Sequence, residues 1–181
     1  MASIQNKILV SIPQGLLSDT EIEQTKSTFN SEEFEINFLK TSSQPQAVIL
    51  STIITITMGI IANVSSDIIF YKIKPILDKL NQAKKEKKLL KFVAHEAPKP
   101  ADISIKLKTK NSEIFLEVVE NVSENHLKEQ FHVLIEAGHE IEQQNSPEKY
   151  YVVHDDSKGN SNIINLEKYT KLRSKNSNLN K

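Results

Sequence analysis

The sequence predicts an α+β protein, and three observations support this prediction. Short runs of alternating apolar and polar residues at 7–12, 34–39 and 103–118 are typical of strands, helix-capping patterns stand between them, and a long uncharged run occupies the middle of the chain. The 181 residues, 38% of them hydrophobic and 25% charged, are enough for one domain with a buried core. We expect a βαβ start, a central hydrophobic helix, a β-hairpin followed by a helix, and a C-terminal hairpin.

The chain is expected to begin with a strand, a helix and a second strand. Residues 7–12 alternate as the first strand. The helix after them begins with a capping box, in which Ser18 caps the first turn and Glu21 returns a hydrogen bond. Residues 34–39 alternate again. Because a helix connects the two strands, we expect them to be parallel.

The middle of the chain, from Thr41 to Ser66, contains no charged residue. We predict one helix from Ala47 to about Ser66. At about 100° per residue, its large apolar side chains occupy a broad arc, and small or weakly polar residues share a narrow stripe. A surface helix would carry Lys, Glu or Gln on that stripe, so we expect another element or chain to approach it closely. The predicted interface residues are Ser51, Thr55, Gly59, Ala62, Asn63 and Ser66.

Two environments fit helix 47–66. It is long enough to span a bilayer, and the lysines after it would anchor a cytoplasmic end, which describes a protein of the inner membrane with a cytoplasmic part. Asn63, several hydroxyl groups and the capped elements on both sides favour instead a helix buried in the core or at an interface. The buried helix is the leading prediction, and the membrane anchor stays open as the alternative.

A basic stretch follows, because residues 72–91 hold eight lysines against two acids. Pro75 is expected to end or kink the preceding helix, and a second helix is expected from Ile76 to about Phe92. Its lysines fit either an outer contact surface or a solvated face balanced by acidic neighbours. The formal net charge is zero, and nothing in the sequence demands a nucleic acid partner. The candidate basic surface consists of Lys84, Lys85, Lys87 and Lys88.

The best candidate for an internal boundary lies at residues 95–101, where two prolines favour an extended connector. After it, residues 103–118 read as a hairpin with one wet face that bears lysines, and Ser123 is placed to cap the next helix. The predicted organisation is an α+β domain over 1–146, a C-terminal hairpin extension over 147–172 and a disordered polar tail over 173–181.

No recognisable catalytic apparatus stands in the sequence. The chain has no cysteine, so it has neither disulfides nor thiolate chemistry, and its four glycines form no phosphate-binding loop. It also lacks a nucleophile elbow and the paired histidines of zinc proteases. We expect no enzymatic activity and no cofactor, although a site assembled from distant serine, threonine or carboxylate residues would escape sequence reasoning.

Histidines and acids gather at two places. His132, Glu136 and His139 share one face of a predicted helix and are candidate metal ligands, but their spacing also fits an ordinary exposed face. Residues His154, Asp155, Asp156 and Ser157 lie at the tip of the expected C-terminal hairpin. Their residue types are those that a turn requires, so we interpret this segment as a turn and not as a calcium site or catalytic dyad.

The absence of cysteine and of a secretory signal in the first residues, MASIQNK, indicates a cytoplasmic protein. The leading expectation for its role is an interaction module that binds a protein partner or forms a homo-oligomer, and a membrane association stays possible through helix 47–66.

The order of the expected elements also carries a resemblance. The elements follow in the order of a βαβ start, a linker, a hydrophobic helix interrupted by glycine (ILSTIITITMGIIANVSSDI), a lysine-rich continuation, the hairpin ISIKLKTKNSEIFLEV and the helix ENHLKEQFHVLIEA. In this layout, residues 8–137 resemble the effector-associated constant component family, small bacterial proteins encoded with effector enzymes in conflict and defence systems. The central run is richer in Ile and Thr than in members of that family. The resemblance implies a non-catalytic adaptor that associates with an effector, a sensor or a membrane and regulates it through an interface.

Overall fold

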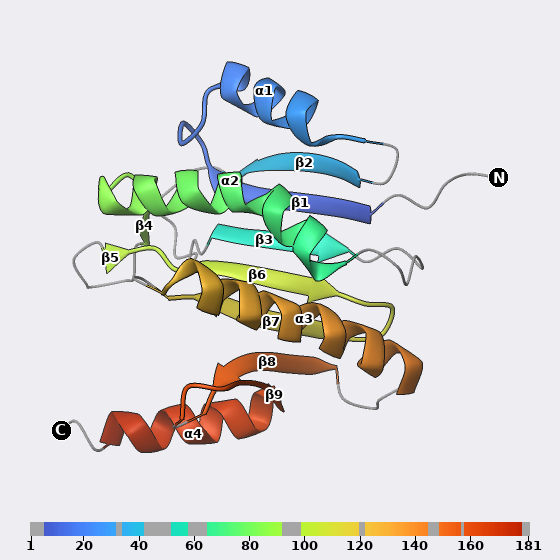
Figure 1. The fold of residues 1–181 in the computed structure, drawn as a ribbon. Coiled ribbons are helices and arrows are strands. Elements are labelled where there is room, and N and C mark those ends of the chain that lie inside the picture. The colour runs from blue at the N-terminus through green and yellow to red at the C-terminus, as the bar shows by residue number, and fades with distance from the viewer. Residues whose placement is uncertain are drawn as a thin grey trace.

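The protein has an α+β fold, built around a seven-stranded mixed sheet in the order β2-β1-β3-β6-β7-β8-β9 (Figure 1). The computed structural model describes residues 6–31, 34–41, 52–57, 65–91, 99–119, 122–144, 149–156 and 158–178. The strands of the sheet are β1 (Asn6–Pro13), β2 (Phe34–Thr41), β3 (Thr52–Thr57), β6 (Ile103–Lys108), β7 (Glu113–Val118), β8 (Tyr150–Asp155) and β9 (Ser161–Asn165). The helices are α1 (Asp19–Phe29), α2 (Ser66–Lys85), α3 (Glu124–Gln144) and α4 (Leu166–Asn178), and β4 (Leu90–Lys91) pairs with β5 (Lys99–Pro100) apart from the main sheet.

The βαβ start is confirmed. β1 and β2 are adjacent and parallel, with Ile8 opposite Ile36. The capping box of α1 is complete, because the backbone N–H of Ser18 donates to a carboxylate oxygen of Glu21 at 2.9 Å and the Glu21 N–H donates to the Ser18 hydroxyl at 3.2 Å. Local hydrogen bonding thus fixes where α1 begins.

The predicted helix from Ala47 to Ser66 is wrong, since residues 52–57 form the central strand β3. β3 is antiparallel to β1 and parallel to β6. Ile54 and Ile56 are buried on one face, whereas Thr57 is exposed on the other. Ile and Thr are β-branched and favour strands, and an uncharged run suits a strand that has a neighbour on each side.

The predicted interface residues therefore do not share a helical stripe. Thr55 lies half-buried on β3, and Ser66 is the first residue of α2. Ser51, Gly59, Ala62 and Asn63 lie outside the described residues. Within the described ranges, no helix is both long and apolar enough to cross a membrane. The membrane-anchor alternative relied on one continuous helix over 47–66, and residues 52–57 in the middle of that range form a strand instead.

α2 continues through Pro75, so the helix does not end at this proline, and of the two predicted effects only a kink stays open. Pro75 is exposed, and its ring removes only the helical hydrogen bond that the Tyr71 carbonyl would otherwise accept. The buried face of α2 runs past the proline without interruption, because Ile73, Ile76 and Leu77 all pack in the core. The helix ends at Lys85, earlier than the expected Phe92.

The hairpin and the helix after it are confirmed. β6 and β7 pair antiparallel, with Ile105 opposite Leu116, and Lys106 and Lys108 lie on the wetter face. The Ser123 hydroxyl accepts a hydrogen bond from the His126 N–H at 3.2 Å at the start of α3. These elements follow the local sequence signals directly.

The C-terminal hairpin of β8 and β9 is also present, and it extends the main sheet because β8 pairs with β7. Strands from both sides of the candidate boundary at 95–101 therefore belong to one sheet. α4 follows β9 directly and continues to Asn178, so residues 173–178 are helical where the sequence predicts disorder.

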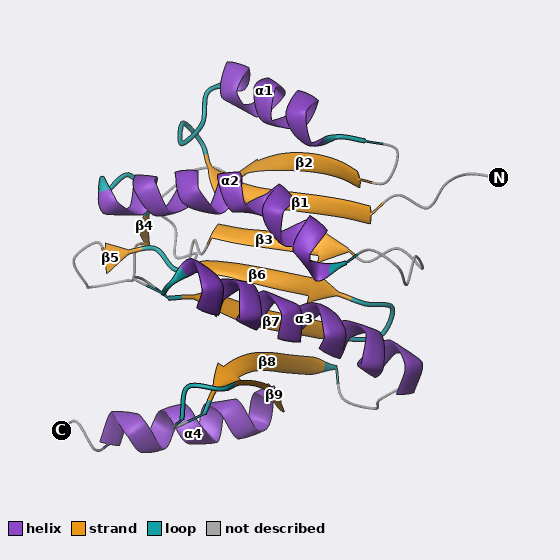
Figure 2. Cartoon of the chain, in the orientation of Figure 1, coloured by secondary structure: helices purple, strands orange, loops and turns teal. Residues whose placement is uncertain are grey.

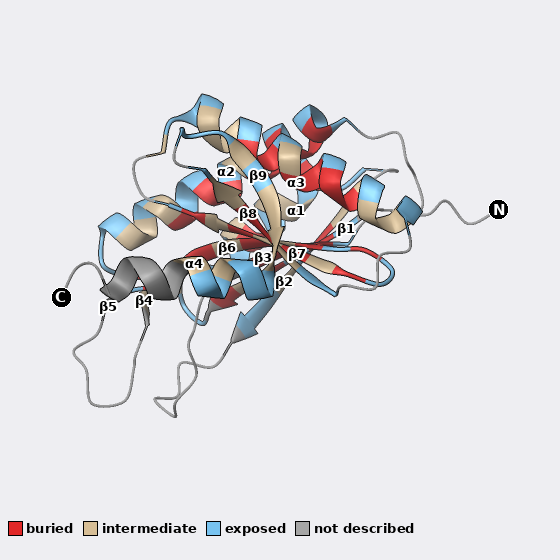
Figure 3. Cartoon of the chain, turned by 90° about the horizontal axis from the view of Figure 1, so that it is seen from below, coloured by how far each residue is buried: buried red, intermediate tan, exposed pale blue. Residues whose placement is uncertain are grey.

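The helices cover the two faces of the sheet unequally (Figures 2 and 3). α1, α2 and α3 lie on one face, where the ring centroids of Phe70 and Phe131 are 5.8 Å apart between α2 and α3. α4 lies against the opposite face beside β8, with its Tyr169 ring 5.9 Å from His154. Along the rest of that face, Lys7 pairs with Glu35 at 3.7 Å and Lys106 with Glu113 at 3.3 Å. Such mixed polarity is typical of a solvated sheet face.

Candidate protein-interaction site

A groove of about 420 Å³ lies between α1 and α2. α1 contributes Thr28 and Phe29, and α2 contributes Tyr71, Pro75 and Ile76. We call it the α1–α2 groove. Its described lining holds no histidine, aspartate or glutamate, and its surface is mainly apolar.

The helical spacing of α2 explains why one side of this helix faces the groove. Tyr71, Pro75 and Lys79 follow one another at intervals of four residues and so lie on one stripe. The opposite side carries Ile73 and Leu80, which are fully buried against the sheet. The core thus fixes the rotation of α2 and presents the groove stripe outward.

Tyr71 is the most exposed large hydrophobic residue of the groove, with 56% of its surface open. Ile68, one turn earlier on α2, is 48% exposed and extends this apolar surface. Lys128 of α3 lies with its Nζ 5.1 Å from the centre of the Tyr71 ring and 3.1 Å from a carboxylate oxygen of Asp67. These contacts orient the Tyr71 ring without covering it.

Lys72 joins the two walls of the groove. Its Nζ donates a hydrogen bond to the carbonyl oxygen of Phe29 at 3.1 Å, and Phe29 is the last residue of α1. The same ammonium lies 5.3 Å from the centre of the Phe29 ring and 6.0 Å from that of Phe34. A positive charge is favourable at a helix C-terminus and over an aromatic face, so Lys72 holds the groove at a fixed width.

Lys79 brings a second positive charge to the groove. It is exposed, and the nearby Glu21 is engaged elsewhere, because the carboxylate of Glu21 accepts hydrogen bonds from the backbone and the hydroxyl of Ser18. These bonds, with a smaller contribution from Lys79, hold the pKa of Glu21 below its usual value. The residues that line the groove thus carry two positive charges, Lys72 and Lys79, and Glu21 is not among them.

Comparisons with known proteins add no relative. No protein-family model, curated protein or solved structure matches the chain. The groove is consequently interpreted from its own geometry.

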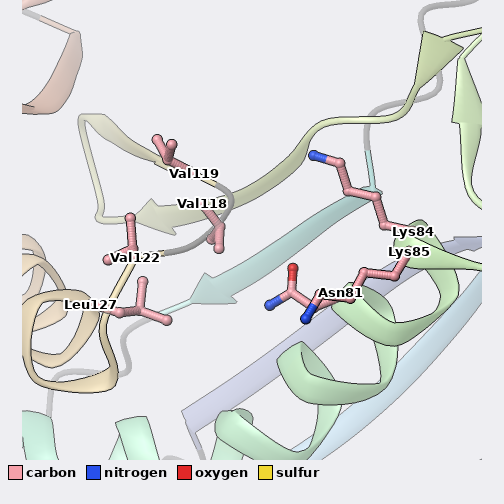
Figure 4. A pocket seen from close by; sticks show the side chains of 7 residues that line it. All are labelled: Asn81, Lys84, Lys85, Val118, Val119, Val122 and Leu127. Atoms are coloured by element: carbon pink, nitrogen blue, oxygen red, sulfur yellow. The ribbon is translucent and has the colours of Figure 1, made fainter.

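The predicted basic surface lies beyond the groove, at the end of α2. Lys84 and Lys85 line a smaller cavity of about 170 Å³ together with Asn81, Val118 and Leu127 (Figure 4). Lys87 adopts a left-handed backbone conformation just after the helix, with φ of 57°, and Lys88 forms an ion pair with Glu86. The structure thus brings two of the four lysines to one cavity, and the contact role of all four stays a prediction.

The candidate metal ligands lie on α3. His132 and Glu136 are exposed and His139 is half-buried. The Nδ1 of His132 lies 2.8 Å from the hydroxyl of Ser66, which ties α3 to the start of α2. Over the part of the chain that the structure describes, no three histidine or acidic side chains are grouped so that they could hold a metal ion.

Sequence reasoning missed a polar cluster between α3 and the C-terminal hairpin. The Nε2 of His126 lies 2.9 Å from a carboxylate oxygen of Asp155, and Gln130 and Ser161 donate to the same carboxylate at 3.0 and 2.8 Å. The Ser161 hydroxyl bonds to Asp155 and not to His126, so this cluster lacks the serine–histidine contact of a nucleophilic site. Only the packing of α3 against β8 and β9 brings these residues together, and no sequence pattern predicts it.

The tip of the hairpin behaves as a turn. The Asp156 carboxylate accepts hydrogen bonds from the backbone N–H groups of Lys158 and Asn160 at 2.8 and 3.0 Å. Those bonds are typical of an aspartate that stabilises a turn. Ser157 lies outside the described residues.

Proposed function

We propose that the chain is a non-catalytic interaction module that binds a protein partner through the α1–α2 groove. The observation that carries this proposal is an apolar groove of about 420 Å³ beside a Tyr71 side chain that is 56% exposed. Tyrosine is enriched where protein interfaces concentrate their binding energy, because it adds a large apolar area and one hydroxyl at low entropic cost.

We also propose that the module acts as an adaptor in the cytoplasm and that its partner is an effector of a bacterial conflict or defence system. What remains of the layout resemblance to the effector-associated constant component family, a βαβ start and a hairpin followed by a helix, supports this choice of partner, whereas residues 52–57 of the central element form a strand and not a helix. The cysteine-free sequence is consistent with a reducing compartment.

Affinity purification of the full chain from its native cells tests the proposal. Tyr71→Ser is compared with Tyr150→Ser, which removes a tyrosine of similar exposure (48%) from β8. We expect Tyr71→Ser to reduce the recovery of a stoichiometric partner by about tenfold or more, as the loss of an interface aromatic does, and Tyr150→Ser to leave it unchanged. Equal recovery of the partner with the wild type, Tyr71→Ser and Tyr150→Ser, at equal melting temperatures of the three proteins, would contradict the proposal.

A further inference from the structure

We propose that the occupant of the α1–α2 groove is an acidic amphipathic helix of a partner protein. This inference rests on the proposed function and gives it a chemical class of partner. Three features of the groove lead to it: the positive charge of its lining, its helical walls, which offer no strand edge, and its apolar floor.

The charge of the groove is one-sided. Its described lining contains two lysines, Lys72 and Lys79, and no aspartate or glutamate. They stand seven residues apart on α2, which places them on the same stripe about 10 Å apart along the helix axis. Carboxylates spaced by two turns on a helix lying along α2 would match both lysines.

Lys72 and Lys79 differ in how they are held. The Lys72 ammonium uses one of its three N–H donors on the Phe29 carbonyl and is fixed there, so it loses little side-chain entropy when a carboxylate arrives. Lys79 is exposed, and the carboxylate of the nearby Glu21 accepts hydrogen bonds from Ser18 in the capping box. Lys72 therefore provides a fixed anchor, and Lys79 is the better position for a charge-reversal test.

The walls of the groove favour an occupant whose backbone N–H and C=O groups are hydrogen-bonded to one another. Both walls are helices, whose N–H and C=O groups bond within each helix except at its ends, so no strand edge is offered to an extended peptide. A helix enters such a groove without leaving its own backbone groups unpaired. Pro75 adds one local exception, because it cannot donate to the Tyr71 carbonyl, and that oxygen is an acceptor for a polar side chain of the occupant.

The apolar floor requires the occupant to be amphipathic. Phe29, Pro75 and Ile76 line the groove between the two lysines, beside the exposed Tyr71 ring. A helix that fills a hydrophobic groove does so with anchors at i, i+3 or i+4, and i+7. Apolar anchors flanked by carboxylates therefore match the groove in both shape and charge.

A second copy of this chain fits the groove less well. α3 is the most acidic of the described helices, and its exposed side carries Glu129, Glu136 and Glu140. Its apolar residues, such as Phe131 and Leu134, point into its own core and are fully buried. α3 can supply the carboxylates but not the apolar anchors, so a different protein is the better occupant.

The test uses the isotope-labelled full chain and two synthetic helical peptides. Both peptides carry the same leucine anchors at i, i+4 and i+7, and one is flanked by glutamates where the other has glutamines. We expect saturable binding of the glutamate peptide below about 1 mM, with amide shifts on α1 and α2, and an affinity about fivefold higher than that of the glutamine peptide, as two exposed ion pairs provide.

Charge reversal identifies the lysines responsible. Lys79→Glu is expected to remove the preference for the glutamate peptide, whereas Lys85→Glu, the same change on the same helix outside the groove, is expected to preserve it. Three results would each overturn the inference: no saturable binding up to about 1 mM, equal affinity for both peptides, or loss of the preference in Lys85→Glu instead of Lys79→Glu.

The inference and the proposed function fail separately. If Tyr71→Ser loses the cellular partner but the purified chain binds both peptides with equal affinity, the inference of an acidic helix is wrong and the proposed interaction module stands. If the chain prefers the glutamate peptide but Tyr71→Ser retains the cellular partner, the groove is not the site of the module and the proposed function is wrong.

Discussion

The Nε2 of His126 lies 2.9 Å from the Oδ2 of Asp155, and this contact joins the first turn of α3 to the end of β8. The hydrogen bond to Asp155 is the main reason why the pKa of His126 is raised above its usual value of 6.5. For Asp155, burial alone would raise the pKa, but the hydrogen bonds from His126, Ser161 and Gln130 outweigh it and hold the pKa below 3.8. Each residue thus favours the charged form of the other.

The His126 contact predicts a stability difference that depends on pH. The raised pKa of His126 means that its contribution is full below about pH 6.5 and disappears as the pH rises through the folded-state pKa. The lowered pKa of Asp155 means that its contribution is full above about pH 3.8 and disappears as the pH falls through its folded-state pKa. The contact is therefore strongest near pH 5.

Urea unfolding of the wild type and His126→Gln measures this dependence. We expect the variant to lose about 1 kcal/mol of unfolding free energy near pH 5, as for a partly exposed charged hydrogen bond, and the difference to shrink towards pH 9 and pH 2. A difference that grows above neutral pH would contradict the assigned contact.

The central strand predicts an uneven response to alanine. Ile54 and Ile56 are 0% and 1% exposed on the same face of β3, so each change to alanine is expected to cost about 3 kcal/mol. Thr57→Ala, on the opposite exposed face, is expected to cost less than about 0.5 kcal/mol. In a helix, residues 54 and 57 would share a face and 56 would not, so similar costs at 54 and 57 with tolerance at 56 would restore the helical interpretation.

Pro75 predicts a gain in stability on its removal. A proline inside a helix is about 3 kcal/mol less favourable than alanine. Alanine also gives the unfolded chain more conformational freedom, which offsets part of this gain. Pro75→Ala is therefore expected to raise the unfolding free energy by about 2 kcal/mol. Gln82→Ala, an exposed change on the same helix, serves as the control and is expected to change it by less than about 0.5 kcal/mol. A loss of stability in Pro75→Ala would mean that α2 breaks at this residue in solution.

The parts of the fold that sequence predicts are those fixed by neighbouring residues. The capping box of Ser18 and Glu21 and the cap at Ser123 are local hydrogen-bonding patterns, and the structure contains both. The alternation of residues 103–118 reports directly which side chains face the core. In each case the signal and the structure lie within a few residues of each other.

The central strand was mispredicted because periodicity alone does not separate a short buried strand from a buried helix. Its alternation of Ile and Thr, from Ile54 to Thr57, and the β-branching of every residue in it were the signals for a strand. The length of the uncharged run outweighed them. That length suited a membrane span, although only the part at residues 52–57 forms the described strand.

The candidate site was beyond sequence reasoning for another reason. The groove needs Phe29 beside Lys72, residues that are 43 positions apart and meet only because two crossover helices lie on the same sheet face. Likewise, His126 and Asp155 are 29 positions apart. Tyr71 and Lys79 belong to the basic stretch, and their spacing places them on one stripe of a helix. Only the position of α1 beside that stripe turns it into one wall of a groove.

Photo-crosslinking in native cells tests most directly whether the α1–α2 groove is a docking site. p-Benzoylphenylalanine replaces Tyr71 in one chain and the comparably exposed Tyr150 in another, so that reactive groups stand at the groove and away from it. We predict an adduct with one other protein from position 71, joined through an acidic helical segment of that protein, and no such adduct from position 150. Recovery of only the free chain from position 71, or the same adducts from both positions, would contradict the account.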